Sequence, residues 1–76
     1  MVVVKKYSIN ILRQKLLGKK VHFTSDCQLF PNFNVTGKVV GISLFGNIPL
    51  IKTILTTGKT INIDGGMSNL SFELLN

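Results

Sequence analysis

The chain has 76 residues, of which nine are basic and three are acidic, so its formal net charge is +6. It contains one cysteine and one histidine, which excludes an internal disulfide and an ordinary zinc site. A chain of this length forms one domain and buries only about 60% of its unfolded surface. No run approaches the ~20 apolar residues of a membrane span, and the lone cysteine favours a cytoplasmic location.

The first quarter of the chain predicts a strand and a short helix. Residues 1–7 are rich in valine and can form an additional edge strand. A helix is expected over residues 9–17, with Ser8 or Asn10 as its N-cap and Gly18 ending it. The spacing of its apolar residues places three of them on one face: Ile9, Leu12 and Leu16.

Residues 19–75 predict five strands separated by short turns. The strands are expected in the segments KKVHFTS, NVTGKVVGISL, IPLIKTILTT, TINID and LSFELL. In the first of them Val21 and Phe23 should face the core. Gly37 and Gly41 lie inside the second, and glycines within strands mark bulges or sharp bends. We therefore predict one all-β domain over residues 1–76, a small five-stranded barrel after a short helix.

The triplet Gly58-Lys59-Thr60 has the letters that close a phosphate-binding P-loop. That loop requires a glycine five residues earlier, where this chain has Thr53, and it must open a helix. Residues 60–64 instead alternate polar and apolar side chains, as a strand does. We interpret the triplet as a hairpin turn, with Gly58 supplying a positive φ.

The net charge is confined to the first 20 residues, which carry six basic residues and no acid. The remaining 56 residues contain three lysines and three acids, and their charges cancel. A basic segment on a neutral body attracts polyanions, although a solubilising face of an amphipathic helix gives the same pattern. The six basic residues are Lys5, Lys6, Arg13, Lys15, Lys19 and Lys20.

Three phenylalanines are expected in loops or turns, namely Phe30, Phe33 and Phe45. Such rings can close the ends of a barrel, stack on single-stranded bases, or anchor a protein partner. Candidates for catalysis are weak, because His22 lies on the outward face of a strand and Cys27 follows an aspartate. Gly65-Gly66 forms either a turn or a backbone nest for an anion, and the turn is favoured. No enzyme activity, cofactor or metal is predicted.

Two short patterns add to this prediction. Within the second strand and the turn after it, glycines, apolar residues and an asparagine recur at fixed spacing: Gly37, Val39, Gly41, Ile42, Asn47 and Ile48. Before the last strand stand Ile63, Asp64 and Gly65. With the order of a helix before five bent strands, the patterns resemble the Sm-like barrels of the Sm and Hfq superfamily, and more broadly other SH3-like small barrels. The likeness covers about residues 12–75.

The resemblance implies an RNA-binding pocket that holds a base and its phosphate. Asn47 and Gly65 stand at matching pocket positions. The chain departs from the family pattern where an aspartate, a methionine and an arginine are replaced by Ser43, Gly46 and Asp64.

The sequence therefore leaves two hypotheses of different class. In the first, the protein binds RNA or single-stranded nucleic acid, the six basic residues following phosphates while Phe30, Phe33, Phe45 and Asn47 contact bases. In the second it is a protein-interaction module, such as a phage-encoded inhibitor of a host protein, or a protein that sequesters a signalling nucleotide. The lysine-rich, AT-biased composition favours a low-GC bacterium or its phage. The apolar content of 45% and the edge strands favour a homo-oligomer.

Overall fold

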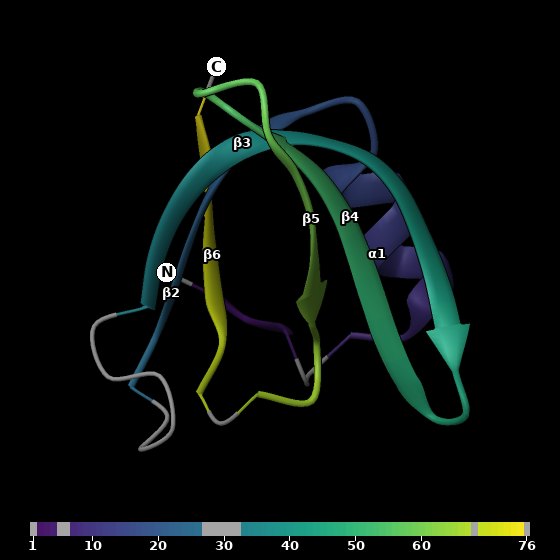
Figure 1. Ribbon diagram of the computed structural model, residues 1–76. Coiled ribbons are helices and arrows are strands. Elements are labelled where there is room, and N and C mark those ends of the chain that lie inside the picture. The colour runs from purple at the N-terminus through teal and green to yellow at the C-terminus, as the bar shows by residue number, and fades with distance from the viewer. Residues whose placement is uncertain (1, 5–6, 27–32, 68, 76) are drawn as a thin grey trace.

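The computed structural model describes residues 2–4, 7–26, 33–67 and 69–75 (Figure 1). A helix and six strands form in the order β1 (Val2–Val3), α1 (Ile9–Leu16), β2 (Lys20–Ser25), β3 (Phe33–Phe45), β4 (Ile48–Leu55), β5 (Thr60–Asp64) and β6 (Ser71–Leu75). The predicted all-β class, with a short helix before five strands, is confirmed.

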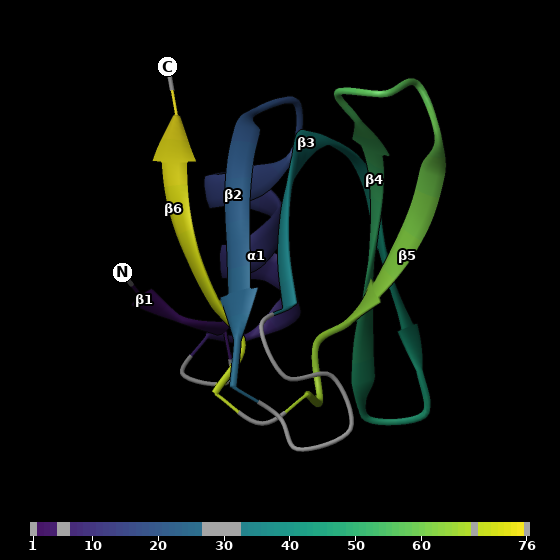
Figure 2. The ribbon, with the colours of Figure 1, turned by 60° about the vertical axis from the view of Figure 1, so that its left-hand side comes forward.

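All the strands join one antiparallel sheet in the order β1-β6-β2-β3-β4-β5. The sheet curls strongly, and β3 and β4 arch across the molecule (Figures 1 and 2). The predicted edge strand near the N-terminus pairs within the chain, because Val2 lies opposite Phe72 and Val3 opposite Ser71. The edges of the sheet are β1 and β5. Closure into a complete barrel stays a prediction.

Local signals explain where α1 begins and ends. Ser8 is the N-cap: its side-chain oxygen accepts a hydrogen bond from the Ile11 amide at 3.4 Å. Gly18 follows the helix at φ +77°, a left-handed conformation that glycine adopts without strain. The helix ends one residue earlier than predicted. Leu12 and Leu16 are buried and Ile9 is half-buried, as the spacing predicts.

Side-chain hydrogen bonds from Arg13 connect α1 to β3 of the sheet. Its Nε and Nη2 both donate to the backbone carbonyl oxygen of Ile42, at 3.2 and 3.1 Å. Two of the five guanidinium N–H groups are therefore used inside the fold. Lys15, two residues further on, places its amine 5.4 Å from the centre of the Tyr7 ring, within reach of a cation–π interaction. Phosphate contacts by these two residues stay a prediction.

We expect Arg13→Gln to lower the free energy of unfolding by about 1–2 kcal/mol, because a pair of charge-assisted hydrogen bonds is lost. The neighbouring substitution Gln14→Ala, on an exposed side chain, should change it by less than about 0.5 kcal/mol. Urea denaturation of the two variants measures the difference. Equal midpoints would show that the Arg13–Ile42 contact does not hold α1 in place.

The bend in β3 depends on a glycine and a bulge. A Cβ at Gly37 would lie 2.7 Å from the Thr53 methyl group and nearer still to the Ile54 carbonyl oxygen, so only glycine fits. The register shifts after Val39, which leaves Val40 as the extra residue of a bulge. The bulge changes which side chains face inward, so that Val39 and Ile42 are both buried. The predicted irregularity between Gly37 and Gly41 is confirmed.

The core fills the inside of the curled sheet. Val21 and Phe23 are fully buried, as predicted from their alternation. They pack with buried residues of α1, β3, β4, β5 and β6 and of two connections between elements: Val4, Leu12, Leu16, Val39, Ile42, Ile51, Ile63, Leu70 and Phe72. Among the described residues, no helix has the length and apolar character needed to cross a membrane.

The Gly58-Lys59-Thr60 segment is a hairpin turn between β4 and β5. The Leu55 amide donates to the Lys59 carbonyl at 2.8 Å, and the Gly58 amide donates to the Leu55 carbonyl at 2.8 Å. Gly58 has a φ of +92°, which matches the predicted positive value. The segment leads into a strand and not a helix, so the P-loop alternative is excluded.

Candidate nucleic-acid interface

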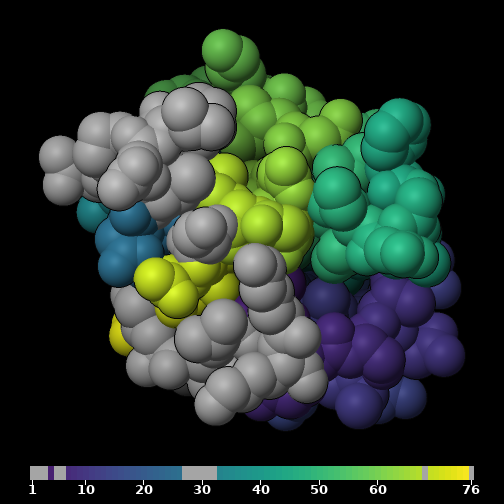
Figure 3. All heavy atoms as spheres, turned by 90° about the horizontal axis from the view of Figure 1, so that it is seen from below, coloured from purple at the N-terminus to yellow at the C-terminus, as the bar shows by residue number. Residues whose placement is uncertain are grey.

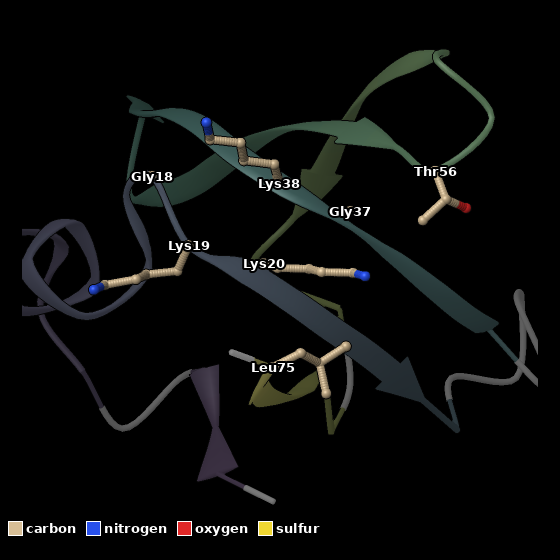
Figure 4. A pocket seen from close by; sticks show the side chains of 7 residues that line it. All are labelled: Gly18, Lys19, Lys20, Gly37, Lys38, Thr56 and Leu75. Atoms are coloured by element: carbon tan, nitrogen blue, oxygen red, sulfur yellow. The ribbon is translucent and has the colours of Figure 1, made fainter.

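A hollow of about 490 Å³ lies at the top of the molecule in Figure 1. Four segments meet there: the connection from α1 to β2, the crest of β3, the β4–β5 turn and the end of β6 (Figure 4). We call it the upper hollow, and it is lined by Gly18, Lys19, Lys20, Gly37, Lys38, Thr56 and Leu75.

The pairing of β2 with β3 and β6 determines where the lysines of the upper hollow lie. Lys20 on β2 lies directly opposite Lys38 on β3, and Leu75 on β6 is opposite Lys20 on the other side. Two hydrogen bonds hold the preceding connection against β3, from the Gly18 amide to the Val39 carbonyl at 2.8 Å and from the Val39 amide to the Lys19 carbonyl at 3.0 Å. The lysines therefore stand on a rigid backbone.

The three amines point in different directions (Figure 4). Lys20 extends along the hollow toward Thr56, Lys19 points to the opposite side, and Lys38 points away from both. Three divergent charges do not converge on one small anion. They suit an extended polyanion, which presents successive phosphates to successive amines.

The described charges are unevenly distributed between the two ends of the molecule. No described carboxylate pairs with Lys19, Lys20 or Lys38, and none lines the upper hollow. Asp26 follows the end of β2 and Asp64 ends β5, and both strands run from the top to the bottom (Figures 1 and 2). The third described carboxylate, Glu73, lies opposite His22 and two residues before Leu75, so one acid stands near the three lysines of the upper end. The lysines outnumber it, and an excess of positive charge attracts polyanions.

The facing lysines should cost stability, because like charges directly opposite on neighbouring strands repel each other. Lys38→Gln removes this repulsion, and we expect it to raise the free energy of unfolding by about 0.2–1 kcal/mol at low salt. Lys52→Gln is the control, since Lys52 is exposed and faces Gly41 and Asn62. Thermal unfolding at low and high salt measures both. A lower free energy of unfolding in Lys38→Gln than in the unaltered protein would show that repulsion between Lys20 and Lys38 does not destabilise the fold.

The opposite end of the molecule carries two of the four predicted base-contacting residues, Phe45 and Asn47. Phe45 ends β3 and is 74% exposed, and Asn47 is exposed in the β3–β4 turn. Here a smaller hollow of about 200 Å³ lies between this turn, the β5–β6 connection and the first part of the chain (Figure 3). We call it the lower hollow, and it is lined by Val4, Tyr7, Asn47, Ile48, Pro49, Gly65 and Gly66. Asn47 and Gly65, the two residues at positions that match the Sm-like pocket, therefore come together.

The Gly65-Gly66 pair forms a turn. The Gly66 amide donates to the Asp64 carboxylate at 2.7 Å, so this amide is not offered to an anion. A Cβ at Gly65 would lie 2.6 Å from the Pro49 ring, and neither glycine has a positive φ. The turn interpretation is supported, but glycine is required at Gly65 by a lack of space and not by its backbone conformation.

The structure divides the predicted site between the two ends. Lys19 and Lys20 line the upper hollow, whereas Phe45 and Asn47 lie at the far end of the molecule (Figure 1). Phe33, expected in a loop, is the first residue of β3 and packs half-buried against the core. Lys5, Lys6 and Phe30 lie outside the described residues.

Of the seven residues that line the upper hollow, only Lys19 and Lys20 were predicted as site residues, and five were not: Gly18, Gly37, Lys38, Thr56 and Leu75. Lys38 lies in a segment whose charges cancel, so its position along the chain gave no signal. Only the register of β2 with β3, which sets Lys38 opposite Lys20, reveals it.

The described residues that most often take part in chemistry lie apart from one another. His22 is half-buried on β2, and its Nε2 hydrogen-bonds to the Asn34 side-chain oxygen on β3. No group of three or more histidine, cysteine or acidic side chains gathers where a metal could bind within this part of the chain. Cys27 is outside it.

Compared with known proteins, the chain matches no family model, no curated protein and no solved structure.

Proposed function

We propose that the protein binds RNA or other single-stranded nucleic acid without catalysing a reaction, and that the upper hollow is the centre of the interface. One observation carries the proposal: Lys19, Lys20 and Lys38 surround a single hollow that no described carboxylate lines. Lys59 adds a further positive charge in the β4–β5 turn, the turn that contains Thr56.

The proposal has a quantitative consequence. Three phosphate contacts to a single strand release counterions, and the affinity should fall about 20-fold between 50 and 200 mM salt. Fluorescence anisotropy with labelled single-stranded RNA and duplex DNA at both salts tests it. Binding that ignores salt, or the absence of binding at 50 mM, would refute the proposal.

The likeness to Sm-like barrels gives further support. A short helix precedes five strands that pair in the order β6-β2-β3-β4-β5, and Asn47 and Gly65 both line the lower hollow, at the opposite end of the molecule from the upper one. Asp64 stands where Sm-like proteins have an arginine. Its carboxylate accepts a hydrogen bond from Gly66, which lines the lower hollow, and its charge would repel a phosphate there. For this reason we assign the main nucleic-acid contact to the upper hollow and not to the family's pocket.

A second candidate, a protein-interaction module, rests on the β3–β4 turn. Leu44, Phe45 and Ile48 are 53%, 74% and 40% exposed. Phe45 lies opposite Ile48 next to the turn, and Leu44 precedes Phe45 on the other face of β3, so this end of the hairpin is apolar. Exposed aromatic and aliphatic side chains of this kind anchor protein partners, and a host protein would be such a partner. Binding to a protein through this end of the hairpin would survive high salt and be lost in Phe45→Ser, with the lysines intact. No observation favours a sequestered signalling nucleotide over a polymer.

We also expect a cytoplasmic homo-oligomer. Two sheet edges could pair with another copy of the chain. One is the outer edge of β5, and the other is the part of β6 after Phe72, which β1 does not cover. Sedimentation analysis of the purified chain tests this, and a monomer at micromolar concentration would refute it.

A further inference from the structure

We infer that the upper hollow receives a nucleobase of a single strand, while the surrounding lysines contact the phosphates on either side. The inference rests on the proposed function and adds to it, because it names the part of the ligand that enters the hollow. If a base enters the hollow, the protein should bind single strands more tightly than polyanions that carry charge but no bases.

The size of the upper hollow fits a small organic group. Its volume of about 490 Å³ lies within the ~300–1,000 Å³ of typical small-molecule sites. The hollow at the opposite end measures about 200 Å³ and a third, beside Phe33 and Met67, about 300 Å³. No lysine lines either of these two among the described residues. Of these three hollows of the described residues, the upper one alone combines room for a ring with positive charge.

The lining of the upper hollow is apolar at its centre and charged at its rim. Leu75 lies on one side of the Lys20 stem and the backbone of Gly37 and Lys38 on the other (Figure 4). Thr56 turns its methyl group toward Lys20 and its hydroxyl away from it (Figure 4). The lysine amines reach outward, so their aliphatic stems contribute to the walls.

This arrangement selects among polyanions by their chemistry. Inorganic polyphosphate and acidic peptides present charge but no flat, weakly polar ring between the charges. Duplex DNA has such rings, but they are stacked inside the helix and cannot enter a hollow without being extruded. A single strand offers both features at once. Because the described lining contains no aromatic ring and few polar groups, a base should be held with little sequence preference.

The test compares an oligothymidylate with an abasic strand of the same length, which has the same phosphates but no bases. We expect the oligothymidylate to bind about fivefold to tenfold more tightly at 50 mM salt, because the base buries apolar surface against the lysine stems, Leu75 and the Thr56 methyl group. Thr56 lies in an exposed turn, and Thr56→Leu places a larger side chain in the hollow. We expect this variant to bind the two strands with nearly equal affinity. Thr57→Leu, at the exposed neighbouring position that does not line the hollow, should leave it unchanged.

The outcomes separate the inference from the proposed function. Equal binding of the two strands by the unaltered protein overturns the inference and leaves polyanion binding in place. A ratio that persists in both Thr56→Leu and Leu75→Ala overturns it as well, since the bases would then bind elsewhere. Failure of both strands to bind, or tighter binding of polyglutamate, overturns the proposed function together with the inference.

Discussion

Replacement of Gly37 by alanine should lower the free energy of unfolding by about 3 kcal/mol or more, whereas replacement of Gly41 should change it by less than about 1 kcal/mol. The two glycines lie in the same strand and were predicted for the same reason. They differ in the space around them. A Cβ at Gly37 would overlap Thr53 and Ile54 of β4, and one at Gly41 would have no neighbour closer than the Lys52 Cβ at 3.9 Å.

The cost at Gly37 is large because the obstacle is backbone. The Ile54 carbonyl oxygen belongs to the β3–β4 ladder, in which Ile54 pairs with Lys38. It can move only if that ladder opens, and the ladder also carries Lys38 to the upper hollow. Loss of about 3 kcal/mol removes a large share of the ~5–15 kcal/mol by which folded domains are stable. Urea denaturation of Gly37→Ala and Gly41→Ala measures the difference, and equal stability of the variants would contradict the described bend.

The second large effect is on binding. Lys20→Glu combined with Lys38→Glu should weaken single-stranded RNA binding about 100-fold or more at 50 mM salt, because each reversal removes an attraction and adds a repulsion of ~1 kcal/mol or more. The salt dependence should also become shallower by about 1.4 in the slope of log affinity against log salt. The two glutamates still face each other as like charges, so stability should change little.

Matched single variants provide the control for this experiment. Lys38→Glu and Lys52→Glu change the net charge equally, but only Lys38 lines the upper hollow. Lys38→Glu should lose at least about tenfold more affinity than Lys52→Glu if the local contact dominates, since ~1.4 kcal/mol corresponds to tenfold. Equal losses would mean that net charge alone attracts the ligand and that the upper hollow has no special part.

Much of the fold follows from short-range signals in the sequence. Ser8 and Gly18 bound the helix because a cap and a left-handed residue act within one turn of it. Val21 and Phe23 face inward because side chains alternate along any strand. The turn at Gly58 requires only its own φ. These features depend on neighbours along the chain, which a single sequence contains.

The candidate site depends instead on contacts between distant residues. β3 spans the molecule, so Lys38 lies at the upper end and Phe45, seven residues later, at the lower one (Figure 1). The predicted joint site of lysines and aromatic rings is therefore divided. Arg13, predicted as a phosphate ligand, uses two of its donors to hold α1 on Ile42. Neither the strand register nor this internal contact can be inferred from composition or spacing.

The most direct test of the central claim is an NMR titration of the ¹⁵N-labelled protein with a short single-stranded RNA. We predict the largest chemical-shift changes at the amides of the upper hollow, in Lys19, Lys20, Lys38 and Thr56, with little change in the β3–β4 turn at Gly46 and Asn47. Changes centred on Gly46, Asn47 and Gly66 would place the RNA at the opposite end and contradict the assignment. The absence of any change at low salt would contradict nucleic-acid binding itself.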